Sequence, residues 1–474
     1  MALQNTRFGA EKISAMMEGR KRLFFDGIGG VSMNALAHMS MLAGYDVAGY
    51  DRTRTDITEK LEKSGARVYY KADARHMKDR DILIYTVAIP EDNPEYRYAK
   101  KNGIPCISRS DYLGYLMTGY KNRIGISGTH GKSTTTAMIG RILAEDGDDP
   151  TVLNGAVMKE TGTVDIIGGS DFFVFEACEY MDSFLDFRPT VAVVLNVELD
   201  HVDYFKSIGQ LIESFGKFVS LTGEQGTAVI NANDPDCIEA VRGTGCRVVT
   251  FAHSNPLADY YSDNETDNGG YPEFDIMSGG KKLAHVRLRI PGEHSVSDAL
   301  AAFAAVSVFG VDPEKAASAL SSYEGIKRRM EKICDTKEGA AVYSDYAHHP
   351  TEIGTTLRGI RKICRGRLTV VYQPHTYSRT AELYDDFVDV FAKGDADKLI
   401  FCDIYAARET NTYGVTSEKL ARDIAARGKD ATAAGSFGEA ADMALASSGD
   451  GDVIVVMGAG DVEKVAEIIK KQSD

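Results

Sequence analysis

The residues with the most readily interpreted chemistry in this sequence are Lys132 and Ser133. They lie in a glycine-rich segment that consists of Gly128, Thr129, His130, Gly131, Lys132, Ser133 and Thr134. Glycines allow backbone N–H groups to approach a phosphate, and the N-terminus of a following helix favours the same negative charge. In such a segment the lysine neutralises the outer phosphates, and the serine hydroxyl binds Mg²⁺. The sequence therefore predicts a polyphosphate site here.

The alternative is that this segment only starts an ordinary helix. Ile126 stands where the standard P-loop pattern has a glycine, so the match to that pattern is incomplete. A serine or threonine N-cap would account for Thr134. It would not account for two glycines, a lysine and a serine directly after the apolar residues Ile124 and Ile126. We therefore favour nucleotide binding over simple capping.

Two further polar side chains follow apolar runs in the same region. Glu176 comes directly after residues 172–175, and His201 lies shortly after residues 191–195. Parallel strands end at one edge of a sheet, so both side chains are expected beside the phosphate segment, where a carboxylate could hold Mg²⁺. The alternative for Glu176 is a solvated acidic loop. Three more acids lie nearby, namely Glu179, Asp182 and Asp186.

The last third of the chain carries a second set of candidates. Arg329 ends a run of three cations that starts at Lys327. Such a run is usually a solvated surface, but at a domain junction Arg329 could stabilise a phosphoryl group during transfer. Three histidines and an arginine follow two apolar runs farther on: His348, His349, His375 and Arg379. An arginine fork binds a carboxylate, and an imidazole titrates near neutral pH and can accept a proton.

A second glycine-rich turn lies near the start of the chain. Gly27, Gly29 and Gly30 follow an apolar run, and Asp51 ends the next one. This arrangement is typical of a dinucleotide-binding βαβ unit, although Ser32 stands where a third glycine would fall. A dehydrogenase is therefore an alternative that this turn alone would allow.

The elements that must position these residues alternate between strand and helix. Apolar runs predict buried strands at 22–26, 45–50, 82–86, 172–175, 191–195, 340–344, 368–372, 398–402 and 453–457. A polar loop or hairpin is expected over 259–280 and an alanine-rich helix over 297–309. The predicted fold is α/β, with three domains that each hold a mainly parallel sheet and flanking helices. We expect a Rossmann-like domain over 1–119, a P-loop-type central domain over 120–324 and a Rossmann-like domain over 325–474.

The composition narrows the functional class. The chain has 474 residues, 43% of them apolar, and a net charge of −15, which argues against nucleic acid or an anionic membrane as the main partner. Its seven cysteines are scattered and form no C-x-x-C pair, a pattern that favours reduced thiols in the cytoplasm. No signal peptide and no membrane-spanning run are apparent.

The order of these motifs along the chain resembles that of the Mur ligases. The resemblance also rests on Pro291 to His294, the segment from Asp345 to Glu352, Gln373 to Thr380, and Gly458 to Asp461. It implies an ATP-dependent ligase that needs Mg²⁺, forms an acyl phosphate and takes part in peptidoglycan precursor synthesis. The Gly27 turn and the paired histidines resemble the members that join L-alanine to UDP-N-acetylmuramate. Ligases that recycle a murein tripeptide share these features and remain an alternative, as does an inactive nucleotide-binding regulator.

The resemblance also implies roles for single residues. Those expected in catalysis are Lys132, Glu176, His201, Arg329, His348 and His349, and those expected to hold magnesium are Ser133, Glu176 and His201. ATP would contact the segment from Gly128 to Thr134 together with His294 and Asp298. The UDP-sugar would contact Gly27, Gly29, Gly30, Asp51, Thr86 and Ile89. The amino acid would contact His348, His375 and Arg379. We expect a monomer or weak homodimer.

The chain departs from the family's usual residues at five positions: Ser133 replaces threonine, Cys178 aspartate, Ser295 and Asp298 asparagine, and Thr376 arginine. Either hydroxyl can bind Mg²⁺, so the first change is conservative. The changes at 295 and 298 predict weaker adenine recognition, since an ionised aspartate can only accept hydrogen bonds. Some family members carry a carbamoylated lysine near the metal, and Lys217 is a candidate, although a solvated surface lysine is the simpler interpretation.

Overall fold

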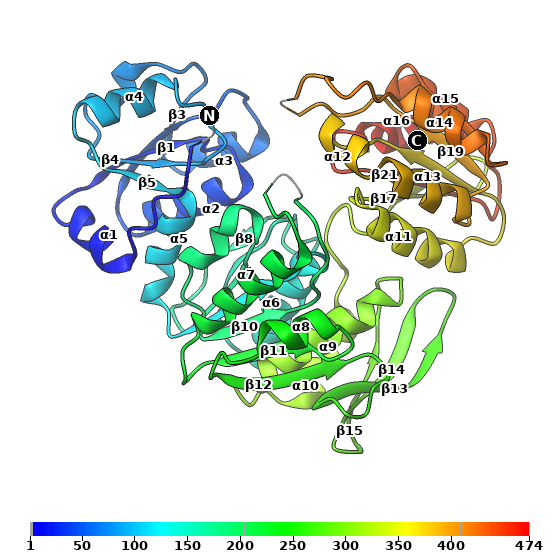
Figure 1. Ribbon diagram of the computed structural model, residues 1–474, viewed down its shortest axis with the longest axis horizontal. Helices are drawn as coiled ribbons and strands as arrows, with labels where there is room; N and C mark the ends of the chain where they lie inside the picture. Colours follow the sequence, from blue (N-terminus) through cyan, green and yellow to red (C-terminus); the bar gives the residue numbers. More distant parts are fainter. Residues whose placement is uncertain (1–2, 202–203, 408, 474) are drawn as a thin grey trace. The chain divides into compact units, whose positions relative to one another are not determined.

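The computed structural model describes residues 3–201, 204–407 and 409–473. It contains three sheets, each flanked by helices (Figure 1). The chain divides into two compact units, and each is described separately. The first unit consists of Met1–Ser262, Ile276–Ala284 and Asp298–Leu320, and the second of Asp263–Asp275, His285–Ser297 and Ser321–Asp474. Among the described residues no helix is long and apolar enough to cross a membrane.

The first sheet has five parallel strands. Their spatial order is β3 (Arg67–Tyr69), β2 (Asp46–Tyr50), β1 (Arg22–Asp26), β4 (Ile82–Tyr85) and β5 (Cys106–Ser108). The flanking helices are α1 (Ala10–Met17), α2 (Val31–Leu42), α3 (Asp56–Lys63), α4 (Pro94–Lys101) and α5 (Arg109–Leu116), with short 3₁₀ helices η1 (Ala74–Met77) and η2 (Met117–Gly119). Phe24 and Phe25 are both fully buried but lie in different apolar clusters. Successive strand residues point to opposite faces, so helices must cover both sides.

The second sheet is built around the phosphate segment. Its order is β15 (Lys281–Arg287), β14 (Pro272–Ser278), β13 (Tyr260–Asp267), β12 (Arg247–Ala252), β11 (Thr227–Asn231), β10 (Val191–Val194), β6 (Asn122–Ser127), β9 (Phe172–Glu176), β7 (Thr151–Leu153) and β8 (Asp165–Ile166). In this spatial order, all neighbouring strands from β13 through β7 pair in parallel, whereas β8 is antiparallel to β7. The polar hairpin expected over 259–280 is therefore the β13–β14 pair.

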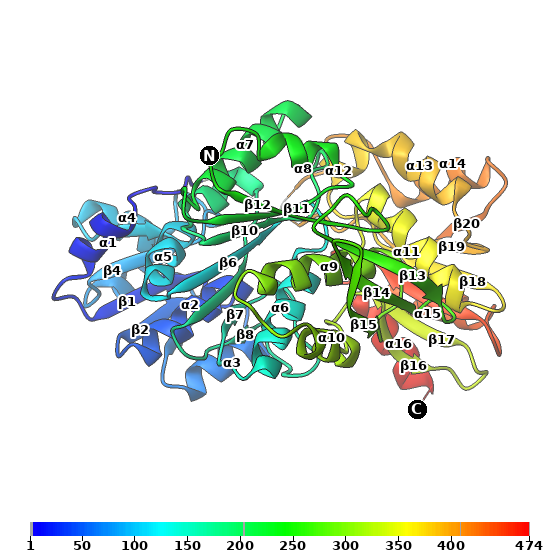
Figure 2. The same ribbon diagram turned by 90° about the horizontal axis from the view of Figure 1, so that it is seen from below.

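Helices cover both faces of this second sheet (Figure 2). They are α6 (Lys132–Asp146), η3 (Tyr180–Asp186), α7 (Ile208–Ser220), α8 (Pro235–Ala240), α9 (His294–Ser307) and α10 (Pro313–Ser322). Helix α7 packs Phe215 and Phe218 into the apolar cluster that holds Ala192 and Val194 of β10. Helix α9 starts at His294, three residues before the helix expected over 297–309 and two residues after Gly292.

The third sheet has one antiparallel edge. Its order is β16 (Glu331–Asp335), β17 (Ala341–Asp345), β21 (Val453–Met457), β18 (Leu368–Tyr372), β19 (Lys398–Phe401) and β20 (Asp430–Ala433), and only β16 runs against its neighbour. Its helices are α11 (Pro350–Ile363), α12 (Tyr377–Glu382), α13 (Tyr384–Lys393), α14 (Ser417–Ala425), α15 (Phe437–Leu445) and α16 (Glu463–Ser473). Val370 and Val371 again lie in separate buried clusters. The predicted α/β fold with three mainly parallel sheets is confirmed.

Candidate active site

The phosphate segment forms the turn between β6 and α6. Gly131 is the N-cap of α6 and has a left-handed φ of 83°. A Cβ atom at Gly131 would lie 2.4 Å from Asp298 Oδ1, so this position also requires glycine for space. Asp298, an expected ATP contact, therefore lies directly against the phosphate turn. Ser133 and Thr134 occupy the first turn of the helix, where backbone N–H groups are unpaired within the helix.

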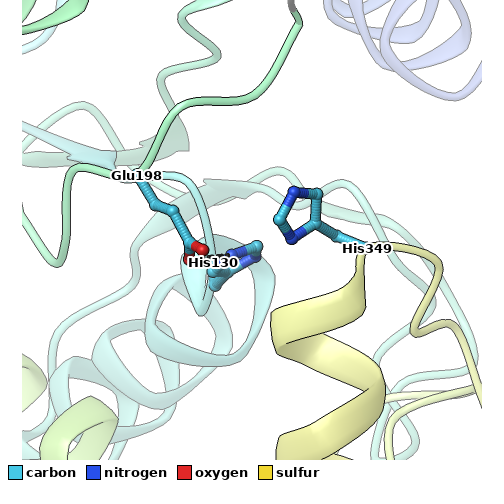
Figure 3. Close-up of side chains that lie close together, drawn as sticks. All are labelled: His130, Glu198 and His349. Carbon is cyan, nitrogen blue, oxygen red and sulfur yellow. Dashed lines mark hydrogen bonds and ion pairs between the residues drawn. The ribbon is translucent and has the colours of Figure 1, made fainter. Parts of the chain in front are cut away.

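The turn is held by the segment that follows β10, its neighbour in the sheet. The Thr129 hydroxyl accepts a hydrogen bond from the Glu198 N–H and donates one to the Glu198 carbonyl, both at 2.9 Å. The His130 N–H donates to Asn196 Oδ1 at 2.8 Å, and its ring Nε2 lies 3.1 Å from Glu198 Oε2 (Figure 3). Backbone and side chains of the two strand ends thus fix the turn before any ligand binds.

Lys132 lies among the carbonyls of its own turn and a buried carboxylate. Its Nζ donates to the carbonyls of Gly128 and Thr129 and lies 3.2 Å from Glu179 Oε2. Burial lowers the pKa of Lys132, but Glu179 and other acidic neighbours outweigh this effect and raise it overall. The lysine is consequently a partly buried cation in a glycine-rich turn, which is the arrangement that attracts an anion.

Glu176 ends β9, on the other side of β6 from β10. Its carboxylate accepts a hydrogen bond from the N–H of Gly155. The charge of Glu176 also contributes to the raised pKa of Lys132, so the two side chains sense each other electrostatically. The expectation that the ends of β6, β9 and β10 share one edge of the sheet is met.

His201 lies at the same edge as Glu176 and Lys132. Its Nε2 is 3.6 Å from Glu179 Oε1, and its ring packs against Tyr180 with 4.6 Å between centroids. Glu179 therefore joins Lys132 to His201. The alternative for Glu176 was a solvated acidic loop, but Glu179 in that segment is only 2% exposed. Glu179 is buried because it lies between Lys132 and His201, an arrangement that the sequence pattern does not reveal.

The residues at this edge fit a magnesium ion. Ser133 and Glu176 offer the hydroxyl and carboxylate oxygens that Mg²⁺ prefers, and the buried Glu179 adds negative charge. His201 offers a nitrogen, which suits transition metals better than Mg²⁺. The donor set as a whole is dominated by oxygen.

The first glycine-rich turn joins β1 to α2 and has a different electrostatic character. The Gly29 N–H donates to Asp51 Oδ2 at 2.9 Å, so this amide is already used inside the protein. Gly27 has φ 88°, and a Cβ atom there would lie 2.8 Å from the Thr86 methyl group. The Ile89 N–H donates to the Thr86 carbonyl at 3.2 Å. The expected UDP-sugar residues are thus in contact with one another around this turn.

A buried acid directly precedes this turn. Asp26 is fully buried, and neither of its carboxylate oxygens has a hydrogen-bond partner within the described structure. Burial and the negative charge of Glu95 raise the pKa of Asp26 well above its usual range, while the nearby Asn93 offsets only part of this. The charge next to this turn is thus acidic, whereas Lys132 places a cation at the other turn.

In the second unit, Asp345 organises the segment around the three cations. At the end of β17, its carboxylate accepts hydrogen bonds from the N–H groups of Met330 and Ala347 and from the Thr356 hydroxyl. These bonds connect the loop before β16 to the start of α11. They place the guanidinium groups beside the histidine segment.

The two arginines of this loop lie over one aromatic ring. The guanidinium carbons of Arg328 and Arg329 are 4.9 and 5.2 Å from the centroid of Tyr346. Arg328 also donates to the carbonyls of Gly458 and Gly460, whereas Arg329 lies 3.6 Å from Glu352. The expectation of a purely solvated cationic surface is therefore not met, because both cations have specific partners.

The paired histidines have different surroundings. His349 is the N-cap of α11 (Figure 3), and its Nδ1 accepts a hydrogen bond from the Thr351 N–H. His348 Nδ1 lies 3.1 Å from both the Tyr346 carbonyl and Glu352 Oε2. His348 is also edge-to-face with His375, at 6.0 Å between centroids.

His375 and Arg379 lie together beside this segment. Arg379 Nη1 is 3.5 Å from His375 Nδ1, and Thr376 caps α12 by accepting from the Arg379 N–H. Burial, His348 and Arg379 lower the pKa of His375 to about 4, so its imidazole is neutral at pH 7. The three expected amino-acid contacts are therefore brought together: His348, His375 and Arg379.

The remaining candidates are Ser295, His294 and Lys217. Ser295 is buried and its hydroxyl donates to the Pro291 carbonyl at 3.0 Å, while His294, at the start of α9, is exposed. Lys217 is exposed on α7 and paired with Glu213 at 2.7 Å, as expected for a surface lysine. The seven cysteines, all within the described residues, form no disulfide.

One contact in the amino-acid cluster had no sequence signal. Glu409 accepts hydrogen bonds from both the N–H and the hydroxyl of Ser378, 31 residues earlier. This carboxylate anchors the first turn of α12, which carries Arg379. It belongs to no motif, and only the fold brings it to this position.

Three domain models of one protein family match this chain. The Mur ligase family catalytic domain matches residues 24–121, the Mur ligase middle domain residues 126–306, and the Mur ligase glutamate ligase domain residues 328–460.

Similar proteins span the whole chain. The UDP-N-acetylmuramate–L-alanine ligase of Caldicellulosiruptor saccharolyticus is 42% identical over 453 residues, covering 95% of this chain and 99% of the relative. That of Clostridium novyi is 39% identical, covering 96% and 98%. The crystal structure of UDP-N-acetylmuramate-alanine ligase from Thermotoga maritima has a TM-score of 0.80 at 25% identity, covering 95% and 98%. A murein peptide ligase from Psychrobacter arcticus shares the fold, with a TM-score of 0.71 at 23% identity, covering 96% and 99%.

Proposed function

Because this chain belongs to the Mur ligase family, we propose that it uses ATP to join L-alanine to UDP-N-acetylmuramate in peptidoglycan precursor synthesis. The observation that carries this proposal is the full-length similarity, at 39–42% identity, to enzymes named for that reaction. The partly buried lysine at a glycine-rich turn is independent physical support, because it suits a triphosphate.

The proposed reaction has two steps. A carboxylate oxygen of UDP-N-acetylmuramate attacks the γ-phosphorus of ATP, the bond to the β-phosphate oxygen breaks, and ADP leaves. The amino group of alanine then attacks the acyl carbon, phosphate leaves, and an amide forms as the amine loses a proton. Such chemistry depends mainly on positioning and on neutralising charge.

We assign the nucleotide to the turn from Gly128 to Thr134. Lys132 would neutralise the outer phosphates, and Ser133, Glu176 and His201 would hold Mg²⁺, which when bound neutralises phosphate charge. Asp298 supports this assignment because it lies against Gly131. His294 as a further ATP contact, and Arg329 as a contact for the γ-phosphate, rest on the family resemblance.

We assign the other two substrates to separate clusters. The UDP-sugar would lie over the turn formed by Gly27, Gly29 and Gly30, with Asp51, Thr86 and Ile89 shaping it. Alanine would bind near Arg379, whose fork suits a carboxylate. His348, His349 and the neutral His375 would border its amine, and His348 is the proposed proton acceptor.

We further propose the domain boundaries 1–119, 120–324 and 325–474, cytoplasmic location, and a monomer or weak homodimer. Two family-model ranges, 126–306 and 328–460, fall inside the second and third domains, and the first, 24–121, ends two residues past the proposed boundary at 119; this agreement supports the boundaries.

A recycling ligase for murein peptides is the second candidate, favoured by the shared fold with such an enzyme over nearly the whole chain. An ADP-release assay with UDP-N-acetylmuramate and either L-alanine, other amino acids or the murein tripeptide separates the two. Our proposal requires the highest kcat/KM with L-alanine. Preference for the tripeptide would favour recycling. If no ADP is released with any of these substrates although the protein binds ATP, the inactive nucleotide-binding regulator is favoured.

A further inference from the structure

The turn from Glu179 to Asp182 has a backbone that ordinary residues seldom adopt. Met181 and Asp182 have φ values of 54° and 55°, both in the left-handed region. His201, which faces this turn, has φ 52°. L-residues occupy this region at an energetic cost, so several interactions must hold the two segments.

Asp182 supplies those interactions. Its carboxylate accepts hydrogen bonds from the Tyr204 hydroxyl, at 2.6 Å, and from the Ser214 hydroxyl of α7. Its own N–H donates to the Glu179 carbonyl at 2.9 Å, which closes the turn. Arg7 lies 3.9 Å from the same carboxylate. One side chain therefore connects the turn to α7 and to the segment after His201.

The opposite side of this turn reaches the candidate ATP site. Glu179 contacts both Lys132 and His201, and Tyr180 packs on the His201 ring. The Tyr204 N–H donates to the His201 carbonyl at 2.8 Å, so Tyr204 ties both strained segments together. A shift of Asp182 would move Glu179 and His201 at once.

From this arrangement we infer that Asp182 is a positioning residue for the ATP site. It holds the Glu179 carboxylate beside Lys132, where this carboxylate neutralises the lysine before nucleotide binds. When nucleotide binds, a phosphate group replaces Glu179 as the partner of Lys132. Asp182 itself touches no substrate. The inference rests on the proposed function only in identifying the ligand of Lys132 as ATP.

Calorimetric binding of Mg²⁺ with a non-hydrolysable ATP analogue tests this inference without turnover. We expect Asp182→Ala to weaken the analogue roughly tenfold, since hydrogen bonds to a charged group are lost. Binding of UDP-N-acetylmuramate should stay unchanged. Asp182→Asn should recover most of the affinity, because its amide can accept from Tyr204 and donate to Ser214.

The matched control is Asp259→Ala. Asp259 also accepts two hydrogen bonds, from the N–H and hydroxyl of Thr250, but it is exposed and does not contact the turn. Unchanged analogue affinity in Asp182→Ala, or equal weakening of both ligands, would overturn the inference. If Asp182→Ala does not fold, Tyr204→Phe, which removes the hydroxyl that donates to Asp182, is tested by the same two binding measurements. A wild-type protein that binds no ATP analogue contradicts the proposed function instead.

Discussion

The two glycine-rich turns of the first unit share a backbone design and differ in their charges. Each joins a buried parallel strand to a helix, and each has a glycine in the left-handed region: Gly27 at 88° and Gly131 at 83°. The later turn is followed by the partly buried cation of Lys132. The earlier turn gives the Gly29 N–H to Asp51 and is preceded by the buried acid Asp26.

This difference shows what glycines do and do not specify. They allow a tight turn and a close approach of the backbone, but the surrounding charges select the ligand. A turn with a buried lysine suits a triphosphate. A turn lined by carboxylates suits groups that donate hydrogen bonds, such as the hydroxyls of a ribose or sugar. The five predictions below test or refine this contrast.

The largest effect is expected for Lys132→Ala. Loss of the Lys132 ammonium should lower kcat roughly 10²–10³-fold, while the KM for UDP-N-acetylmuramate stays nearly unchanged. ADP release is the measurement, with the exposed Lys217→Ala as the control. Retention of more than about a tenth of wild-type kcat, which means that the activation free energy rises by less than roughly 1.4 kcal/mol, would exclude Lys132 as the phosphate lysine.

Metal dependence gives the second test. Glu176→Ala and His201→Ala should each raise the Mg²⁺ concentration needed for half-maximal ADP release by about tenfold or more, because each removes a proposed ligand. Glu213→Ala, on the exposed surface of α7, is the control. Identical Mg²⁺ titrations for both variants and the wild type would refute the metal assignment.

A third strand–turn–helix unit consists of β18 and α12. Its turn is not glycine-rich, and Arg379 lies on α12. Arg379→Lys should raise the alanine KM by about tenfold, since a point charge cannot reproduce a two-pronged contact. The ATP KM should change little. Steady-state kinetics with each substrate varied will show this, and a selective rise in the ATP KM would move Arg379 to the phosphate site.

The first turn is tested by Asp51→Ala. Without the acceptor for the Gly29 N–H the turn should loosen, and the KM for UDP-N-acetylmuramate should rise several-fold. Asp46→Ala is a suitable control, since Asp46 lies at the other end of β2 and is paired with Arg67 and Arg80. Equal kinetics of the two variants would show that Asp51 does not shape this site.

The smallest effect concerns stability. Folding raises the pKa of Asp26, so the unfolded state ionises first, and the free energy of unfolding falls as pH rises above the ordinary value of about 3.8. Asp26→Val removes this buried acid and should stabilise the protein by about 1–3 kcal/mol at pH 8 and by less at pH 4. Denaturant unfolding at both pH values measures the difference, and a gain that is the same at both would contradict it.

The sequence predicted strands most accurately where both faces of the strand are buried. The runs 368–372 and 453–457 are apolar throughout and match β18 and β21. Short strands at or next to a sheet edge, such as β7 (three residues) and β20 (four residues), carry no such run and were not expected.

For the candidate site, motif residues were predictable but their partners were not. Lys132, Glu176 and His201 were expected at one edge of the sheet and lie there. No role was predicted for Glu179, because the local sequence does not show that it is buried between two basic side chains. Glu409 reaches Ser378 only through folding, and the burial of Asp26 depends on packing that a single polar residue in a strand does not reveal.

The contrast between the two turns is tested most directly by crossed calorimetric titrations. Wild type, Lys132→Ala and Asp51→Ala would each be titrated with UDP-N-acetylmuramate and with a non-hydrolysable ATP analogue plus Mg²⁺. Our account predicts that Lys132→Ala weakens only the ATP analogue, by about tenfold or more, and that Asp51→Ala weakens only the UDP-sugar. Weakening of both ligands by the same factor in either variant would contradict two separate sites distinguished by their charges.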